Sequence, residues 1–497
     1  MVLHDAATAL VDLLLPAVCP GCRVRPGPPL CDVCHKGLPR LRHPCPRCGR
    51  PRWRPDEACP ACNGDGLPGF RRVIVTWAYR DLIATLVQRA KAAEDAKAAP
   101  APAAETAPAP VAAEPVAKPV SAPWPFFYGP KMNGVYDEGP ILTEWPKGGL
   151  KQLWRRPVGG GYASMTVAQG LIFTIEQRLD QETVAAYELG TGRERWTNKW
   201  KAFFREAMGG DGPRATPVWS RGRIYALGAE GEFRCLDAAS GKTLWRKNIL
   251  EEAGAPNLTW GMAASPLIVD SMVVVMPGTG VVAYDAESGA KRWSSLEDKA
   301  AYTAPVVATL GGRRQIVAVT ASRVVGLSIE EGKLLWEFPW RTEYDVNSTL
   351  PLMVDGNRFI ISAGYGHGSS LVEVAGESAK EIWHTNHLKT KFNNAVLHQG
   401  AAYGLDEGIM EAVDVSSGKR LWKGGRYGYG QILLASGHII VLTETGDVAL
   451  VQATPERHVE VARFEALSGK TWNVPAIAEG ILLVRNTTEM AAYRIGR

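Results

Sequence analysis

The last three quarters of the chain repeat one pattern of apolar and polar positions. An alternating stretch ends in a polar residue, a turn rich in Ser, Thr, Gly, Lys or Arg follows, and the next stretch ends in tryptophan. Alternation with a period of two is typical of strands, and glycine in the turn allows the positive φ that a tight connection needs. Six lines follow this pattern and end at Trp196, Trp245, Trp293, Trp336, Trp383 and Trp422.

The spacing of these tryptophans predicts a β-propeller. Successive tryptophans lie 49, 48, 43, 47 and 39 residues apart. Two more strand-like stretches precede each line, as in "RATPVWSRGRIYALG", so each repeat supplies four strands. Repeats of about 40 to 50 residues with short strands are typical of propeller blades.

The two ends of the repeat region predict how the ring closes. Six blades end at Trp422, and "QILLASGHIIVLTETGDVALVQ" begins a seventh. The C-terminal stretch supplies only three strands, and "LKQLWRRPV" around Trp154 can supply the missing outer strand. We therefore expect an all-β, eight-bladed propeller over residues 124–497, closed by pairing between its two ends so that no sheet edge is left open.

The remaining chain divides into two parts. Residues 91–123 are mostly Ala, Pro, Glu and Val without an aromatic side chain. Such a stretch cannot bury enough apolar surface to fold, so we expect a disordered, extended linker. Residues 1–90 form a separate module that contains eight of the nine cysteines.

With "WPFFYGPKMNGVYDE", "TGRERW", "SGKTLW" and "SGKRLW" in view, residues 124–497 resemble the PQQ-like β-propeller repeat family. That family includes quinoprotein alcohol dehydrogenases, which bind pyrroloquinoline quinone (PQQ), and BamB-like outer-membrane assembly factors. The resemblance implies the eight-bladed fold, but a fold does not determine an activity. The dehydrogenases carry adjacent cysteines and a calcium-binding Glu, Asn and Asp set, neither of which we can place in this propeller.

A candidate ligand site lies where the chain approaches the innermost strand of each blade. Aligning these approaches brings eight residues to one end of the central channel: Tyr162, Arg214, Trp260, Tyr302, Asn347, Asn394, Tyr429 and Trp472. Flat aromatic rings, an arginine and two amides could hold a planar anion such as PQQ. The alternative, which we favour, is that they pack the channel mouth or contact a peptide.

The cysteines of the first module form four C-x-x-C pairs, which are Cys19 with Cys22, Cys31 with Cys34, Cys45 with Cys48, and Cys59 with Cys62. Two such pairs complete a tetrahedral four-thiolate zinc site, so the module predicts two structural zinc ions. Cys31-x-x-Cys34-His35 also has the form of a haem attachment signature, but haem would leave six cysteines unexplained. Sequential pairing of the knuckles is our expectation, and the nearly equal gaps also allow a cross-braced arrangement.

"LLLPAVCPGC", "PLCDVCHKGLPRL" and "PCPRCGRP" resemble the double zinc ribbon of ComF-family proteins. In that family a phosphoribosyltransferase-like domain with an Asp-Asp pair follows. The resemblance ends near Lys91 and this chain has no Asp-Asp pair. We therefore do not expect phosphoribosyltransferase activity.

Charge and the N-terminal residues bear on partners and compartment. Residues 1–90 hold 13 Lys and Arg against 7 Asp and Glu, so the module could make weak nucleic-acid contacts. No stretch predicts a membrane span, and "MVLHDAAT" lacks the basic residues of a signal peptide. We expect a cytoplasmic monomer, with the periplasm or cell envelope as the alternative compartment.

The sequence leaves two hypotheses for the function. The leading hypothesis is a non-catalytic binding or scaffold protein with a protein or peptide partner at the propeller face, and the second is a PQQ-dependent oxidoreductase.

Overall fold

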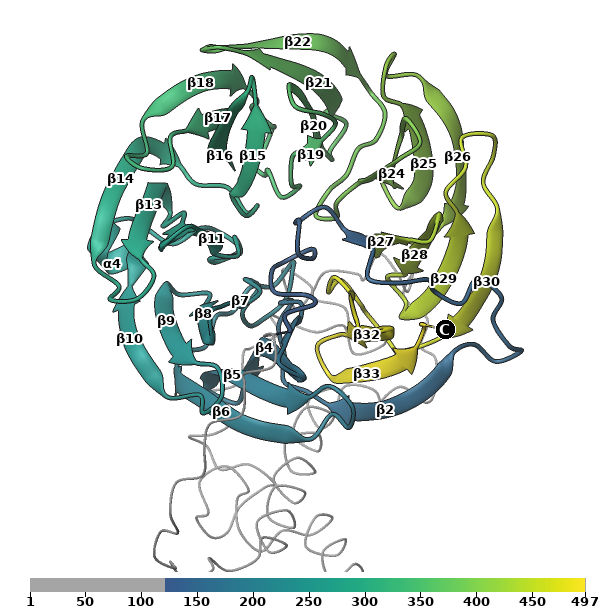
Figure 1. Ribbon diagram of the computed structural model, residues 1–497, viewed down its shortest axis with the longest axis horizontal. Helices are drawn as coiled ribbons and strands as arrows, with labels where there is room; N and C mark the ends of the chain where they lie inside the picture. Colours follow the sequence, from purple (N-terminus) through teal and green to yellow (C-terminus); the bar gives the residue numbers. More distant parts are fainter. Residues whose placement is uncertain (1–120, 497) are drawn as a thin grey trace, which may run out of the picture. The chain divides into compact units, whose positions relative to one another are not determined.

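The computed structural model describes residues 121–496, and these residues form the propeller expected from the repeats. Eight sheets are arranged around one axis, each with its innermost strand toward the channel and its outermost strand on the rim (Figure 1). Within residues 121–496 no helix has both the length and the apolar character needed to cross a bilayer.

The expected zinc sites lie outside the described residues, and so does the linker expected over residues 91–123 except for its last three residues. Of these, the Ser121 carbonyl accepts the Gln169 backbone N–H at 2.7 Å, so the propeller begins slightly earlier than expected. Zinc binding and the pairing of the knuckles therefore stay predictions. The cysteines concerned are Cys19, Cys22, Cys31, Cys34, Cys45, Cys48, Cys59 and Cys62.

The first four blades follow one another along the chain. Blade 1 contains β3 (Thr166–Ala168), β4 (Leu171–Arg178), β5 (Gln181–Glu188) and β6 (Glu194–Lys201). Blade 2 contains β7 (Val218–Ser220), β8 (Arg223–Leu227), β9 (Glu232–Asp237) and β10 (Thr243–Asn248), and is followed by the short helix α4 (Ile249–Ala253). Blade 3 contains β11 (Leu267–Val269), β12 (Met272–Val275), β13 (Thr279–Asp285) and β14 (Lys291–Lys299). Blade 4 contains β15 (Val306–Leu310), β16 (Arg313–Val319), β17 (Arg323–Leu327) and β18 (Leu334–Pro339).

The other four blades complete the ring. Blade 5 contains β19 (Leu352–Met353), β20 (Arg358–Ala363), β21 (Gly368–Ala375) and β22 (Ser378–Thr385). Blade 6 contains β23 (Val396–His398), β24 (Ala401–Asp406), β25 (Ile409–Asp414) and β26 (Arg420–Arg426). Blade 7 contains β27 (Gln431–Ala435), β28 (His438–Leu442), β29 (Asp447–Gln452) and β30 (Glu460–Glu465). Blade 8 contains β31 (Ala476–Ala478), β32 (Ile481–Arg485), β33 (Glu489–Arg494) and, from the start of the domain, β2 (Lys151–Pro157).

Ring closure by the two ends of the domain is confirmed. β2 pairs antiparallel with β33, so the first strand of the ring becomes the outer strand of the last blade. The buried guanidinium of Arg485 on β32 adds a second connection, donating to Thr174 Oγ1 at 2.5 Å and to the Gly159 carbonyl at 3.1 Å. Blades 8 and 1 are thereby joined both by sheet pairing and by polar contacts inside the ring.

At five places in the ring, the turn motif of one blade and a tryptophan of the preceding blade act together. In "DAASG", the carboxylate of Asp237 accepts hydrogen bonds from the Ser240 backbone N–H and hydroxyl, and Gly241 follows with φ +71°. The indole of Trp196, on the preceding blade, donates to the Ala238 carbonyl at 3.1 Å, and its ring lies so close to Gly241 that no Cβ would fit. Glycine is therefore needed for both the left-handed backbone and the close approach. Trp154, Trp245, Trp293 and Trp383 dock in the same way on the next blade.

Every outer strand carries a one-residue β-bulge directly before the position of the docking tryptophan. The skipped residues are Leu153, Arg195, Leu244, Arg292, Leu335, Ile382, Leu421 and Val461. A bulge interrupts the ladder and bends an edge strand, which makes pairing with another chain less favourable. The bulges also explain why four of these aliphatic side chains are exposed on the rim, namely Leu244, Ile382, Leu421 and Val461.

The segment before β2 was not anticipated as part of the ring interior. In Figure 1 it is dark blue and crosses the centre of the propeller. Its short strand β1 (Val135–Tyr136) pairs parallel with β27, so blade 7 has five strands. The hydroxyl of buried Tyr128 donates to the Ile432 carbonyl at 3.0 Å, and the Trp124 backbone bridges to Val167. This segment therefore contributes to the walls of the channel.

Candidate functional site

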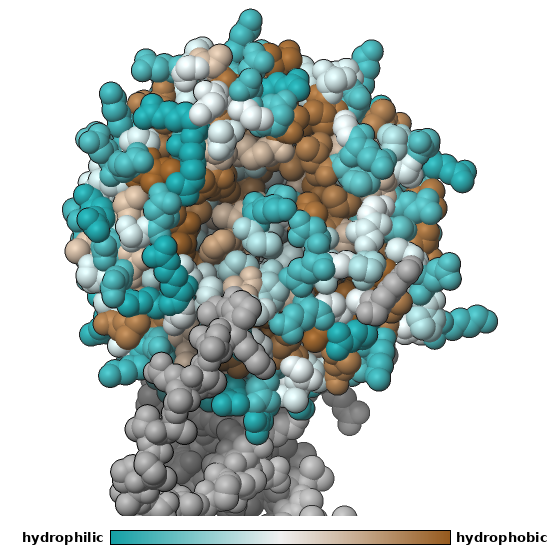
Figure 2. Space-filling model, in the orientation of Figure 1, coloured by the Kyte–Doolittle hydropathy of each residue, from teal (hydrophilic) through white to brown (hydrophobic). Residues whose placement is uncertain are grey.

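A cavity of about 350 Å³ lies at the channel, where the loops leading to the innermost strands converge. All eight blades contribute to it, together with Phe127 from the crossing segment. Figure 2 shows one face of the ring, with many polar side chains along the rim and apolar side chains mixed with polar ones around the central hollow. The cavity is lined by Phe127, Tyr162, Met208, Gly209, Arg214, Trp260, Ala263, Ser265, Tyr302, Thr303, Ala304, Val346, Ser348, Tyr365, Lys391, Phe392, Tyr429, Gln431, Trp472 and Val474.

Six of the eight residues expected at the channel mouth line this cavity. They are Tyr162, Arg214, Trp260, Tyr302, Tyr429 and Trp472. The structure brings them together, and ligand binding by them stays a prediction.

The other two expected residues, Asn347 and Asn394, are not part of the lining. The buried amide of Asn347 donates to the Thr320 carbonyl at 2.9 Å, while its neighbours Val346 and Ser348 face the cavity. Asn394 Oδ1 accepts the Leu350 backbone N–H at 2.8 Å. Both side chains form hydrogen bonds with backbone groups instead of lining the cavity. The expected ring of eight lining residues is therefore wrong at these two positions.

Aromatic rings form a continuous wall on one side of the cavity. The ring centres of Phe392 and Trp472 lie 4.7 Å apart, those of Phe392 and Tyr429 5.5 Å apart, and those of Tyr162 and Trp472 5.6 Å apart. Trp260 and Tyr302 form a second, edge-on pair at 5.3 Å. Phe392 was missed in the sequence, although it lies only two positions before Asn394 in "TKFNN".

The cavity lining is cationic. Among the lining residues Arg214 and Lys391 carry positive charge, and none of them is an Asp or Glu. The Lys391 ammonium lies 4.4 Å from the ring centre of Tyr365 and 4.5 Å from that of Tyr429, and its hydrogen bond to the Tyr429 hydroxyl is long, at 3.4 Å. Within residues 121–496, no carboxylate lies within ion-pair distance of this ammonium. The group is therefore positioned by two rings and free to accept an anionic partner.

Arg214 also stabilises its own loop, which the sequence did not indicate. Its guanidinium donates to the carbonyls of Gly212 at 2.6 Å and Gly210 at 2.5 Å, which belong to its own loop. Burial lowers the pKa of this group, but an arginine stays charged at neutral pH. Lys470, on the approach to blade 8, also reaches this loop, donating to the Gly209 carbonyl at 2.8 Å while it lies 3.7 Å from the ring centre of Trp472. Only part of the Arg214 donor capacity remains for a ligand.

Comparison with known proteins shows which families the two parts of the chain are similar to. Residues 180–424 match the family model described as Outer membrane protein assembly factor BamB, and residues 10–63 match the one described as Double zinc ribbon domain. The propeller is a BamB-like domain. The Outer membrane protein assembly factor BamB of Burkholderia pseudomallei (strain K96243) is 23% identical over 293 residues, which are 57% of this chain and 71% of that protein.

Solved structures show that the BamB-like propeller shares its fold with proteins of different activities. BamB from Moraxella catarrhalis has a TM-score of 0.52 at 16% identity and covers 69% of this chain and 97% of its own. Quinohemoprotein alcohol dehydrogenase from Comamonas testosteroni has a TM-score of 0.52 at 12% identity, covering 70% and 77%. At these identities the likeness concerns the fold alone.

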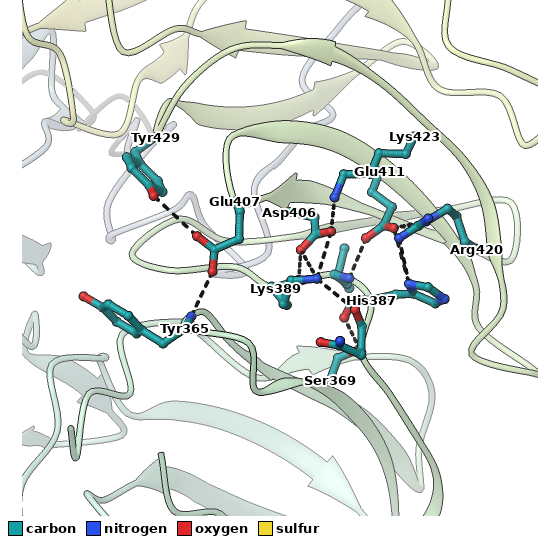
Figure 3. A network of polar contacts seen from close by, with 12 residues as sticks. Tyr365, Ser369, His387, Lys389, Asp406, Glu407, Glu411, Arg420, Lys423 and Tyr429 are labelled. Atoms are coloured by element: carbon teal, nitrogen blue, oxygen red, sulfur yellow. Dashed lines mark hydrogen bonds and ion pairs between the residues drawn. The ribbon is translucent and has the colours of Figure 1, made fainter. Parts of the chain in front are cut away.

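Behind the aromatic wall of the BamB-like propeller, two carboxylates hold the rings in place. Figure 3 shows Glu407 between Tyr365, whose backbone N–H it accepts at 2.9 Å, and Tyr429, whose hydroxyl lies 3.4 Å away. Glu444 accepts the Trp472 indole N–H at 2.8 Å and the Tyr429 backbone N–H at 3.2 Å. These contacts join the loops of blades 5 to 8 into one preformed wall.

A buried charge network anchors the loop that carries Lys391. Figure 3 shows Asp406, which accepts the Lys389 backbone N–H at 3.0 Å and pairs with the ammonium groups of Lys389 and Lys423. Burial alone would raise the pKa of Asp406, but the hydrogen bonds from the two lysines outweigh it and lower this pKa. Glu411 accepts the Leu388 backbone N–H at 2.6 Å and pairs with Arg420. The loop from 386 to 391 is thereby fixed, although it carries two lysines.

The part of the chain that the structure describes was compared with the requirements of a metal site. Within residues 121–496 no three His, Cys, Asp or Glu side chains are grouped closely enough to hold a metal ion. His384 Nδ1 lies 2.9 Å from the Ser370 hydroxyl, but this pair is on the outer half of blade 5 and does not line the cavity. The aromatic wall and two cations fit the flat anionic body of PQQ, whereas a calcium ligand set beside it is not found among these residues.

Proposed function

We propose that this chain is a non-catalytic binding protein whose propeller receives a segment of a partner polypeptide at the channel mouth. The observation that carries the proposal is the composition of the cavity, an aromatic wall with two cations and, among its lining residues, no carboxylate. Two of its lining residues are accessible, since Met208 is 70% exposed and Tyr365 42%, and Tyr344, 58% exposed, packs edge-on against Tyr365. Aromatic and apolar side chains at an accessible surface are typical of protein recognition sites.

The outer strands of the propeller also favour the channel mouth as the binding surface. A polypeptide partner could otherwise add a strand to an outer edge, but all eight outer strands are bulged. Bulges disfavour strand addition, which leaves the channel mouth as the better binding surface. The name of the Burkholderia relative, an assembly factor for outer membrane proteins, is in keeping with a protein-binding role.

The N-terminal module is proposed to hold two structural zinc ions on its eight cysteines, as its match to the double zinc ribbon family supports. Four thiolates leave no open position on zinc, so the module would stabilise its own fold and carry no reaction. Weak nucleic-acid contact by this basic module, a monomeric state and a cytoplasmic location stay predictions.

The proposal is tested by selecting peptides from a displayed random library on the purified full chain. Recovered peptides should bind with measurable affinity and lose at least tenfold on Trp472→Ala, because that ring is central to the aromatic wall. Leu244→Ala, at an exposed bulge on the rim, is the matched control and should bind as the wild type does. Peptides that bind both variants equally would contradict the proposal.

A PQQ-dependent oxidoreductase is the second candidate, because a flat anion also fits the aromatic and cationic cavity. Titration of the full chain with PQQ, with and without calcium, tests it directly. Saturable binding accompanied by dye-linked oxidation of an alcohol would favour this candidate over the peptide-binding function.

A further inference from the structure

A lysine lies at each end of the aromatic wall. The rings of the wall follow one another in the order Tyr429, Phe392, Trp472 and Tyr162, with neighbouring centres 5.5, 4.7 and 5.6 Å apart. The ammonium of Lys391 lies 4.5 Å from the ring centre of Tyr429, at one end. The ammonium of Lys470 lies 3.7 Å from the ring centre of Trp472 and 5.2 Å from that of Tyr162, at the other end. A flat apolar surface is therefore bordered by positive charge on two sides.

The charged end of Lys391 is the accessible part of this side chain. Its stem packs on Gly364, where an added Cβ would lie only 3.1 Å from the lysine Cα, Cβ and Cγ atoms. Because the residue is only half-buried, its remaining surface lies toward the ammonium. Among the described residues the ammonium has one hydrogen bond, the long one to the Tyr429 hydroxyl at 3.4 Å, although it can donate three. Donors therefore remain for a ligand.

Tyr365 holds its ring against this ammonium from a strained turn. The residue has φ +56° between β20 and β21, a conformation that bulky side chains rarely adopt. Glu407, in the matching turn between β24 and β25, accepts the Tyr365 backbone N–H at 2.9 Å and so holds the turn. The accessible ring lies 4.4 Å from the Lys391 ammonium. The turn thus keeps an aromatic ring and a cation together at the edge of the cavity.

The propeller does not neutralise the two lysines itself. Lys470 is exposed, and within residues 121–496 neither its ammonium nor that of Lys391 lies within ion-pair distance of an Asp or Glu, whereas five other lysines do form such pairs. The carboxylates behind the wall, Glu407 and Glu444, accept hydrogen bonds from neutral N–H and O–H groups instead. A ligand that covers the wall therefore meets two cations that still lack an anionic partner among these residues.

We infer that the cavity accepts an acidic segment of a polypeptide, in which an aromatic side chain lies between two Asp or Glu residues. The aromatic side chain packs against Phe392 and Trp472, and the two carboxylates pair with Lys391 and Lys470. A chain terminus supplies only one carboxylate, so an internal segment with acidic side chains matches the two cations better. This inference rests on the proposed function and specifies which polypeptide segments the channel mouth accepts.

The test uses three synthetic peptides on the purified full chain with isothermal titration calorimetry. The first is acetyl-Glu-Gly-Trp-Gly-Glu-amide, and the second has Gln in place of both Glu. The third is the Gln peptide with a free C-terminal carboxylate, which represents a chain terminus. We expect the first to bind about tenfold more tightly than the second and more tightly than the third, because hydrogen bonds to a charged group have about this effect. Added salt should reduce the difference, because it screens exposed charges.

Variants assign the preference to its residues. Lys391→Met keeps the length of the stem and should weaken binding of the Glu peptide about tenfold while leaving the Gln peptide unchanged. Lys470→Met should weaken binding of the Glu peptide only a few-fold, because pairs between exposed charges are weaker. Lys242→Met, at an exposed turn of blade 2, is the matched control and should keep the full preference. A thermal melt checks that each variant folds.

The outcomes separate this inference from the proposed function. Equal affinities for the Glu and Gln peptides, a preference that survives Lys391→Met, or no saturable binding at millimolar concentration overturn the inference. Binding of the third peptide as tight as that of the first overturns the choice of an internal acidic segment. If library-selected peptides still bind and still require Trp472, the proposed function stands without the inference. If neither the synthetic nor the selected peptides bind, both fail.

Discussion

The indole nitrogen of Trp154 donates a hydrogen bond to the Leu189 carbonyl at 2.8 Å. Trp154 lies on β2, the first long strand of the propeller and the outer strand of blade 8, and Leu189 follows β5 of blade 1. The ring of Trp154 also covers Gly192, which has φ +65°. The contact that joins successive blades elsewhere in the ring is thus repeated at the point where the ring closes.

Truncation of this tryptophan tests the closure. Trp154→Ala removes a buried ring and the bond to blade 1, so the free energy of unfolding should fall by about 3–5 kcal/mol. Urea denaturation of the full chain measures the loss. Trp145→Ala is the control, because Trp145 is only half-buried in the same segment and should lose clearly less. Equal stability of the Trp154 variant and the wild type would contradict the closure.

Arg214 should affect both the loop that it holds and the cavity that it lines. Arg214→Ala frees the carbonyls of Gly210 and Gly212, so the loop should open more often and trypsin should cut faster after exposed Arg205. Limited proteolysis with mass spectrometry measures the rate. Lys242→Ala should leave the rate unchanged, and an unaltered rate in the Arg214 variant would show that the guanidinium does not hold the loop.

The raised pKa of Glu182 predicts that the free energy of unfolding falls as the pH rises. Burial raises the pKa of this carboxyl from 4.5 to about 7, although the Ala229 N–H and the Trp200 indole donate to it at 2.9 and 3.0 Å. The folded state therefore keeps a proton that the unfolded state loses above pH 4.5, so this stabilisation is present below that pH and is lost on approaching pH 7. The full effect is about 3 kcal/mol.

The pH effect is measured as the slope of the unfolding free energy between about pH 5 and 7. Glu182→Gln cannot titrate, so its slope should be less negative than that of the wild type, whatever its absolute stability. Identical slopes for the two proteins would mean that the carboxylate is ionised in the folded propeller.

The N-terminal module predicts two zinc ions per chain, and cysteine variants reveal their pairing. With sequential pairing, Cys19 and Cys31 belong to one site, so Cys19→Ser combined with Cys31→Ser should leave one zinc ion. Cross-braced pairing places them in different sites, and the same double variant should then lose both ions. Elemental analysis after desalting measures the ratio, and a wild-type ratio near one would contradict the two-site prediction.

Much of the fold could be predicted because each repeat specifies its own geometry. The Asp-x-x-Ser-Gly turn ending at Gly241 needs a left-handed glycine, and Trp196 needs a surface without a Cβ, so motif and structure agree residue by residue. The crossing segment could not be predicted in this way. β1 has only two residues and pairs with β27, about 300 positions away, and no periodic pattern announces such a contact.

The candidate site was predicted in part, because alignment locates a position but not the direction of its side chain. Six aligned residues reach the cavity, whereas Asn347 and Asn394 bond to backbone instead. Lys391 was missed because its neighbour in the alignment, Asn394, was chosen to represent blade 6. A search for cations within three residues of each aligned position would have found Lys391 and Lys470.

The most direct test of peptide binding at the channel mouth is a crystal structure of the full chain with a library-selected peptide. We expect peptide density in the cavity, with an aromatic side chain against Phe392 and Trp472 and a carboxylate within hydrogen-bond distance of Lys391 Nζ. Peptide bound along an outer strand of the rim, with the cavity free of it, would contradict binding at the channel mouth.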